Sequence, residues 1–117
     1  MKPLTKQKCI PCESNIPPMS EDEIKASQQK VPEWDVVDVE NAHHLKRSFK
    51  FENFTEALSF TNKIGELAEE QGHHPVIELT WGRVTVEWWT HNIGGLHNND
   101  FIMAAKTSQA YQNRNYG

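Results

Sequence analysis

Residues 69–100 read EEQGHHPVIELTWGRVTVEWWTHNIGGLHNND, and both the predicted fold and the predicted site depend on this stretch. It contains four of the six histidines and three of the four tryptophans of the chain. Apolar and polar residues alternate on both sides of Gly82 and Arg83, which predicts two strands joined by a tight turn. We therefore expect a β-hairpin that carries reactive and aromatic side chains.

The predicted hairpin brings its histidines to one end. With this turn, residues whose numbers sum to about 165 lie opposite one another, so His91 should face roughly residue 74. His73 and His74 follow a helix end at Gly72, and Pro75 fixes the direction of the chain after them. Three imidazoles are therefore expected to converge at that end.

Helical signals precede the hairpin in two places. Ser20 and Glu23 have the spacing of a capping box, and the short helix that they begin should end before Pro32. Asn53 is positioned to cap a second helix, in which apolar residues recur at helical spacing up to Gly72. This second segment has the most regular helical pattern of the chain, and it leads directly into the hairpin.

The remaining pattern completes an α+β fold. Segments 34–39 and 45–51 are predicted to form two antiparallel strands with one solvent-exposed face. A third helix, capped near Asn98 or Asn99, should follow the hairpin. The order α-β-β-α-β-β-α predicts a four-stranded antiparallel sheet with helices packed on one face. Residues 20–117 are expected to form this single domain, preceded by an extended or mobile N-terminal arm, residues 1–19.

Composition argues against several classes of function. The net charge of −4 argues against nucleic acid as a direct partner, because phosphate binding needs clustered Lys and Arg. No run approaches the roughly 18 apolar residues of a membrane span, and no apolar signal core begins the chain, so we expect a cytoplasmic protein with no membrane partner. Only 37% of the residues are hydrophobic, so burial against a copy should help, and we expect a homodimer or homotetramer.

Cys9 and Cys12 form one CxxC motif in the N-terminal arm. One such pair is half of a zinc site or a redox motif, but a second pair of ligands and a strand-to-helix context are missing. We interpret the two residues as cysteines of the arm, with a zinc site or a disulfide left open as alternatives.

A cluster of histidines can supply both partners of an elimination. Neutral imidazole accepts a proton and imidazolium donates one near pH 7, so one ring can act as a base while another protonates a leaving hydroxyl. Glu69 could orient a ring or bind a polar heterocycle, and Trp34 offers a flat apolar wall. No nucleophilic serine or cysteine is needed for this chemistry.

Each of these features also has a plainer interpretation. The three imidazoles could bind zinc or be structural, and the tryptophans of the hairpin are typical of a core or an interface. Glu69 could be a solvated acid at a helix end, and Asp100 could simply begin the third helix.

The same residues resemble the signature of the pterin-4a-carbinolamine dehydratase family. The spacing that carries the resemblance runs from Glu69 through His73-His74-Pro75 and Trp81 to His91 and Asp100, with Trp34 at the position of the family's upstream tryptophan. The resemblance covers roughly residues 20–112, and GLHNNDFIMAA together with the CxxC arm is similar to the bacterial branch.

This resemblance implies a dehydratase that converts 4a-hydroxytetrahydrobiopterin, or a related 4a-carbinolamine, to the quinonoid dihydropterin. His73 and His91 would transfer protons, and His74 would mainly bind the substrate. The resemblance places the remaining site residues in substrate binding: Trp34, Glu69, Pro75 and Asp100. It implies no metal or organic cofactor.

The resemblance also implies possible partners. The dehydratase would serve recycling of the cofactor of an aromatic amino acid hydroxylase, a functional link rather than a contact. As an alternative function, animal members of the family act as dimerisation partners of a homeodomain transcription factor. A binding role of that kind would need an exposed apolar helix or strand edge, whereas the enzyme needs His73 and His91.

Overall fold

The computed structural model describes residues 3–10 and 16–114 of the chain. Its main elements are, in order, α1 (Glu21–Gln28), β1 (Asp35–Val39), β2 (Ala42–Lys50), α2 (Phe54–Gln71), β3 (Val76–Thr80), β4 (Arg83–Trp88) and α3 (Asn98–Gln112). Two short 3-10 helices, η1 (Leu4–Lys6) and η2 (His91–Ile93), lie before α1 and after β4. The predicted order of helices and strands is confirmed.

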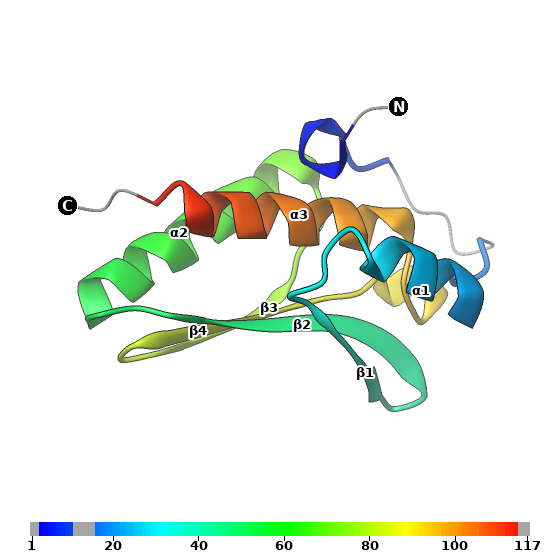
Figure 1. Ribbon diagram of the computed structural model, residues 1–117, viewed down its shortest axis with the longest axis horizontal. Helices are drawn as coiled ribbons and strands as arrows, with labels where there is room; N and C mark the ends of the chain where they lie inside the picture. Colours follow the sequence, from blue (N-terminus) through cyan, green and yellow to red (C-terminus); the bar gives the residue numbers. More distant parts are fainter. Residues whose placement is uncertain (1–2, 11–15, 115–117) are drawn as a thin grey trace.

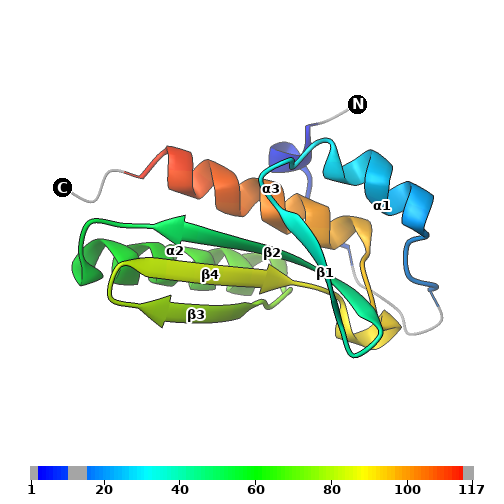
Figure 2. The same cartoon turned by 60° about the horizontal axis from the view of Figure 1, so that its bottom comes forward.

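The four strands form one antiparallel sheet in the order β1-β2-β4-β3. Figures 1 and 2 show the three helices on one face of this sheet, with α2 and α3 crossing it side by side. The predicted α+β class, with helices packed on one face of the sheet, is therefore confirmed. In the described part of the chain, no helix combines the length and the apolar character needed to cross a bilayer.

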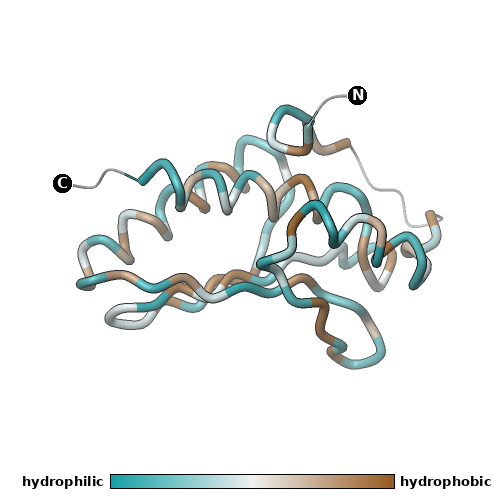
Figure 3. Tube along the Cα trace, viewed as in Figure 1, coloured by the Kyte–Doolittle hydropathy of each residue, from teal (hydrophilic) through white to brown (hydrophobic). Residues whose placement is uncertain are grey.

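The core lies between the sheet and the helices because alternate strand residues face the same side. Leu45 and Phe49 of β2 pair with Trp88 and Val84 of β4, and all four are buried. Figure 3 shows the corresponding alternation of apolar and polar residues along the strands. The expected alternation in β2, with one wet face, is thus present.

The hairpin turn differs by one residue from the prediction. Thr80 pairs with Arg83, so Trp81 and Gly82 form a two-residue turn, and Val76 pairs with Glu87, so paired numbers sum to 163. Trp81 lies in this turn and is 69% exposed, so it belongs to neither the core nor a strand. The sequence could not fix the register here, because moving the turn by one residue slides the pairing by two positions and leaves every side chain on the same face.

The second helix begins and ends as its sequence predicted. The side chain of Asn53 accepts a hydrogen bond from the backbone N–H of Glu56 at 2.9 Å, which caps the first turn. Gly72 has a φ of 66°, the left-handed conformation that commonly ends a helix and that glycine adopts without strain. The chain therefore turns sharply just before the paired histidines.

The third helix begins one residue earlier than predicted. His97 is its N-cap, and Nδ1 of the imidazole accepts the N–H of Asn99 at 3.0 Å. The carboxylate of Asp100 accepts the N–H of His97 in return, which completes a capping box. The usual capping residues are Ser, Thr, Asp and Asn, so the prediction chose the neighbouring asparagines rather than His97.

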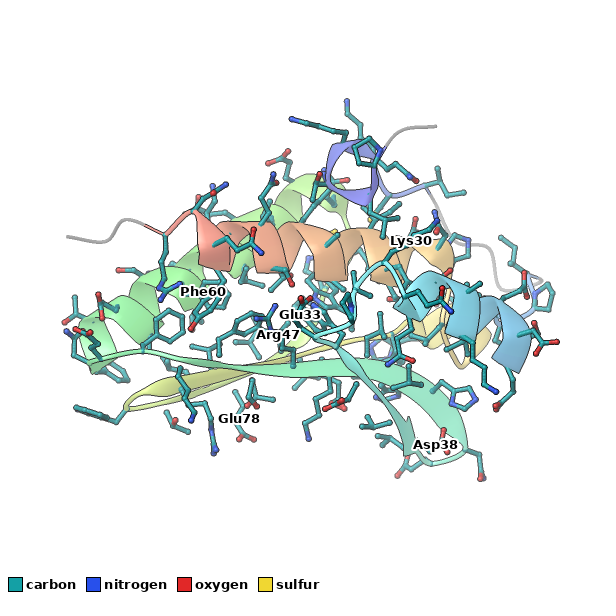
Figure 4. All side chains as sticks on the ribbon, viewed as in Figure 1. Lys30, Glu33, Asp38, Arg47, Phe60 and Glu78 are labelled. Atoms are coloured by element: carbon teal, nitrogen blue, oxygen red, sulfur yellow. The ribbon has the colours of Figure 1, made fainter. Side chains whose placement is uncertain are left out.

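A small, partly buried polar network joins the sheet to α3. The Ser108 hydroxyl receives hydrogen bonds from Nε1 of Trp34 and from Arg47, both at 2.8 Å. Figure 4 shows Arg47 beside Glu33 between the sheet and α3, whereas Glu78 points away from the helices. Burial lowers the pKa of the Arg47 guanidinium from its ordinary value, and the charge of Glu33 opposes that shift.

The described part of the N-terminal arm packs on the domain. Leu4 in η1 is buried in the core cluster, and the backbone carbonyl of Thr5 accepts a hydrogen bond from Lys106 on α3 at 3.0 Å. Figure 1 shows η1 resting on the outer side of α3. The sequence had predicted an extended or mobile arm. Cys12 and the predictions made for it lie outside the described residues.

Candidate functional site

A pocket of about 490 Å³ opens at the end of the hairpin that carries the histidines. Four segments that are distant in the sequence line it: the end of α2 and the loop after it, the loop after β4, the start of α3, and the N-terminal arm. The lining residues are Cys9, Ile10, Gln71, Gly72, His73, His74, Thr90, His91, Asn92 and Asn99. The three histidines therefore line one pocket, although the pairing register used to bring them together differs from the observed one.

His73 is held in a fixed orientation on the inner side of this pocket. Its Nε2 lies 2.6 Å from Oδ1 of Asp100, and its ring stacks on Trp88 at 5.6 Å between ring centroids. Only 13% of the side chain is exposed. A carboxylate accepts hydrogen bonds, so this contact suits a ring with its proton on Nε2, which would leave Nδ1 for a contact with a ligand.

Asp100 supports His73 from behind and does not line the pocket. Its side chain is fully buried, and its second oxygen, Oδ2, accepts from the Thr90 hydroxyl at 2.8 Å and from the N–H of His97 at 2.9 Å. The sequence had placed Asp100 among the substrate-binding residues. The structure instead gives it contacts that orient His73 and can stabilise a positive charge on that ring.

His74 lies on the solvent side of the pocket. Its Nε2 is 2.5 Å from Oε2 of Glu69, which comes from the last turn of α2. The two side chains are 62% and 79% exposed. Glu69 does not line the pocket, so its described contact with the site is through the His74 ring.

His91 is exposed and rests on a stack of aromatic rings. The strand β4 ends at Trp88, and His91 begins η2, so it leaves the regular strand that was used to predict its partner. Its ring lies 4.4 Å from the Trp89 ring, and Trp89 stacks on His44 at 4.0 Å with nearly parallel planes. His44 is buried, so it supports one side of this stack from inside the domain.

Two predicted site residues lie elsewhere. Trp34 is fully buried, packs edge-on against Phe49 and donates its N–H to Ser108, so none of its surface is available to form a wall of this pocket. Pro75 is half-buried after the paired histidines but is not among the lining residues. It precedes β3, where it directs the chain into the sheet.

Several lining residues were not identified from the sequence. Thr90 and Asn99 flank predicted site residues, so proximity along the chain was a usable signal. Cys9 and Ile10 had no such signal, because they lie 62 and 89 positions before the residues that bind them, Gln71 and Asn99. Gln71 is the last residue of α2, where a polar side chain is ordinary, so the helical pattern gave no reason to select it.

The described residues do not favour the zinc interpretation of the histidine cluster. His73 and His74 each direct Nε2 at a carboxylate oxygen. Within residues 3–10 and 16–114, no group of three or more His, Cys, Asp or Glu side chains is arranged to hold a metal ion.

Comparison with known proteins relates the whole chain to one family. The family described as "Pterin 4 alpha carbinolamine dehydratase" matches residues 17–110. A protein of Microcystis aeruginosa named "Putative pterin-4-alpha-carbinolamine dehydratase" is 49% identical over 98% of this chain and 99% of its own length. A protein of Nitrosococcus oceani with the same name is 53% identical over 93% of this chain and 96% of its own length.

Solved structures show the same fold. A transcriptional coactivator/pterin dehydratase from Brucella melitensis is 30% identical, with a TM-score of 0.74, over 80% of this chain and 98% of that chain. A pterin dehydratase-like protein identified as a RuBisCO assembly factor in the alpha-carboxysome shares the fold at 19% identity, with a TM-score of 0.56. That second likeness covers 65% of this chain and 86% of the other, and it concerns the fold alone.

Proposed function

The chain belongs to the pterin 4 alpha carbinolamine dehydratase family, and we propose that its histidine pocket dehydrates 4a-hydroxytetrahydrobiopterin or a related pterin 4a-carbinolamine. The names of the family and of its relatives support the dehydratase activity. The single observation that carries the assignment of the site is the pocket in which His73, His74 and His91 meet, with Asp100 behind His73.

The reaction needs one base and one acid on a flat ring. N5 loses its proton to the base, the electron pair forms the N5=C4a double bond, and the C4a–O bond breaks. The departing hydroxyl takes a proton from the acid and leaves as water, and the product is the quinonoid dihydropterin. Positioned side chains accelerate such proton transfers by about 10²- to 10⁴-fold.

We assign the base to His73. Its Nε2 is occupied by Asp100, so Nδ1 is the nitrogen that accepts the proton from N5. The imidazolium formed in this step lies against a buried carboxylate, which stabilises the charge. Trp88 restricts the ring to one orientation, so the base is held ready before the substrate enters.

We assign the acid to His91. It is exposed, so it can exchange protons with water after each turnover, and Trp89 limits the movement of its ring. His74, paired with Glu69 at the pocket mouth, binds a polar edge of the heterocycle. The product is the pterin whose reduction regenerates the cofactor of an aromatic amino acid hydroxylase, so the proposed role is cofactor recycling.

Stopped-flow dehydration of a freshly generated 4a-carbinolamine, corrected for the spontaneous reaction, tests the assignment. His73→Ala and His91→Ala should each lower kcat by about 10²- to 10⁴-fold. His74→Ala should mainly raise KM, because it removes a binding contact present before and during the reaction.

His43→Ala is the matched control. His43 is a half-exposed histidine that contacts Glu21 and Asp38 and does not line the pocket. Its replacement should leave kcat and KM unchanged. Wild-type kcat in His73→Ala, with a far-UV spectrum of the folded protein, would overturn the assignment of the base.

We also propose that the chain forms a homodimer or homotetramer. Phe54 and Leu58 lie one turn apart on α2 and are 45% and 40% exposed, and β1 and β3 are the edge strands of the sheet. Light scattering at micromolar concentration should give a mass two or four times the 13.5 kDa of one chain. Replacing both residues with serine should shift the mass toward the monomer, and a monomeric wild-type chain would contradict the proposal.

A further inference from the structure

We propose that Ile10, held beside the histidines by the N-terminal arm, contacts the substituent of the pterin ring and sets the preference of the pocket for substituted substrates. This inference rests on the proposed dehydratase function. It assigns part of the substrate site to a segment that lies before the first helix and outside the sheet.

The arm is attached to the pocket by backbone hydrogen bonds. The N–H of Cys9 donates to Oε1 of Gln71 at 2.9 Å, and the N–H of Ile10 donates to Oδ1 of Asn99 at 3.0 Å. Nδ2 of Asn99 donates in return to the carbonyl of Ile10 at 2.7 Å. The Asn99 side chain therefore binds both polar backbone groups of Ile10, much as a neighbouring strand does.

The attachment is firm because its anchors are buried. Asn99 is 2% exposed in the first turn of α3. Earlier in the arm, Leu4 is buried in the core cluster, and Lys106 donates to the backbone carbonyl of Thr5. The described arm is thus attached to α3 both near its start and beside the histidines.

The Ile10 side chain is not needed for this attachment. It is 59% exposed, although it is a large apolar group at the edge of a pocket. Among the described lining residues, it is also the one branched aliphatic side chain, since most of the others are histidines or amides. Apolar surface in this position gains free energy when a ligand covers it.

A pterin has two chemically different parts, which match the polar residues of the pocket lining and the apolar side chain of Ile10. The fused ring carries polar edges, which suit the amides and imidazoles, and the reduced ring carries the substituent. With His73 and His91 at N5 and C4a, the substituent lies on the same reduced ring as the reacting atoms. Of the described lining residues, Ile10 is the one whose branched aliphatic side chain would suit a contact with it.

Two carbinolamines separate this inference from the proposed function. They are prepared fresh from 6-methyltetrahydropterin and from unsubstituted tetrahydropterin, and kcat/KM is measured for each. Wild type should favour the methyl compound by roughly three- to fivefold, the effect of one buried methyl group. Ile10→Ala should reduce that ratio to about one, mainly by raising KM for the methyl compound.

Val76→Ala is the matched control, because Val76 is an aliphatic residue, 48% exposed, on β3 and outside the pocket lining. It should keep the wild-type ratio. The inference is overturned if wild type converts both compounds with no preference. It is also overturned if Ile10→Ala keeps the wild-type ratio of kcat/KM. Neither result contradicts the proposed dehydratase activity. Absence of turnover of either compound by wild type overturns both.

Discussion

The two adjacent histidines, His73 and His74, lie at similar distances from a carboxylate but in different surroundings. The His73–Asp100 pair joins atoms 2.6 Å apart, with the side chains 13% and 0% exposed. The His74–Glu69 pair joins atoms 2.5 Å apart, with the side chains 62% and 79% exposed. Water and ions screen the exposed pair, whereas the buried carboxylate has neither, so burial rather than distance ranks the two contacts.

The largest effect should come from removing the charge of the buried carboxylate. Asp100→Asn keeps the size of the side chain but cannot stabilise an imidazolium, so kcat should fall about 10²-fold or more with little change in KM. Stopped-flow dehydration measures both constants. Glu69→Gln makes the same change at the exposed pair. An equal fall in kcat there would contradict the ranking of the two contacts by burial.

A smaller effect is expected when a hydrogen bond to that carboxylate is removed. Thr90→Val deletes the hydroxyl that donates to Asp100, so the buried Oδ2 loses one of its two described donors. The free energy of unfolding should fall by about 1–3 kcal/mol, as measured by urea denaturation, and kcat should fall about tenfold.

Thr85→Val, in β4 just before Thr90 in the chain, provides the matched control. Thr85 is half-buried and pairs with the Ser48 hydroxyl on the open face of the sheet. Its replacement should change the free energy of unfolding by less than about 1 kcal/mol and leave kcat unchanged. Equal losses in the two variants would show that the buried carboxylate has no special dependence on its donors.

His91 is exposed like His74, but among the described residues its contact is with the Trp89 ring and not with a carboxylate. Trp89→Leu removes that ring and should lower kcat about threefold to tenfold, through a less well positioned acid. Trp89→Phe, which retains an aromatic face, should recover most of the rate. Trp81→Leu at the exposed turn is the control, and a loss of rate there would contradict this account.

The smallest effect should come from the exposed pair. Glu69→Gln should change kcat less than about threefold, because a solvent-exposed ion pair contributes little and is weakened by salt. Measuring KM at low and at high ionic strength sharpens the test, since any effect of the charge on KM should shrink as salt is added. A large fall in kcat that persists at high salt would reverse the ranking of the two carboxylates.

Much of the fold followed from local patterns. The alternation around Leu45 and Phe49, the cap at Asn53 and the left-handed glycine at position 72 each depend on neighbouring residues, and each appears in the structure. The turn at Trp81 and Gly82 was predicted one residue late, because pattern alone does not fix register.

The site was predictable only where it depends on the hairpin. His91 approaches the paired histidines because antiparallel strands bring their opposite ends together. The burial of Trp34 under α3 and the place of Ile10 beside Asn99 depend on contacts between residues more than 70 positions apart, for which a single sequence has no periodic signal.

The grip of Asn99 on Ile10 uses only main-chain atoms of the arm. Any amino acid except proline supplies the same N–H and carbonyl, so these two hydrogen bonds do not depend on the side chain at position 10. Position 10 is therefore suited to saturation mutagenesis, which varies the proposed contact with the substrate while the histidines of the pocket are left unchanged.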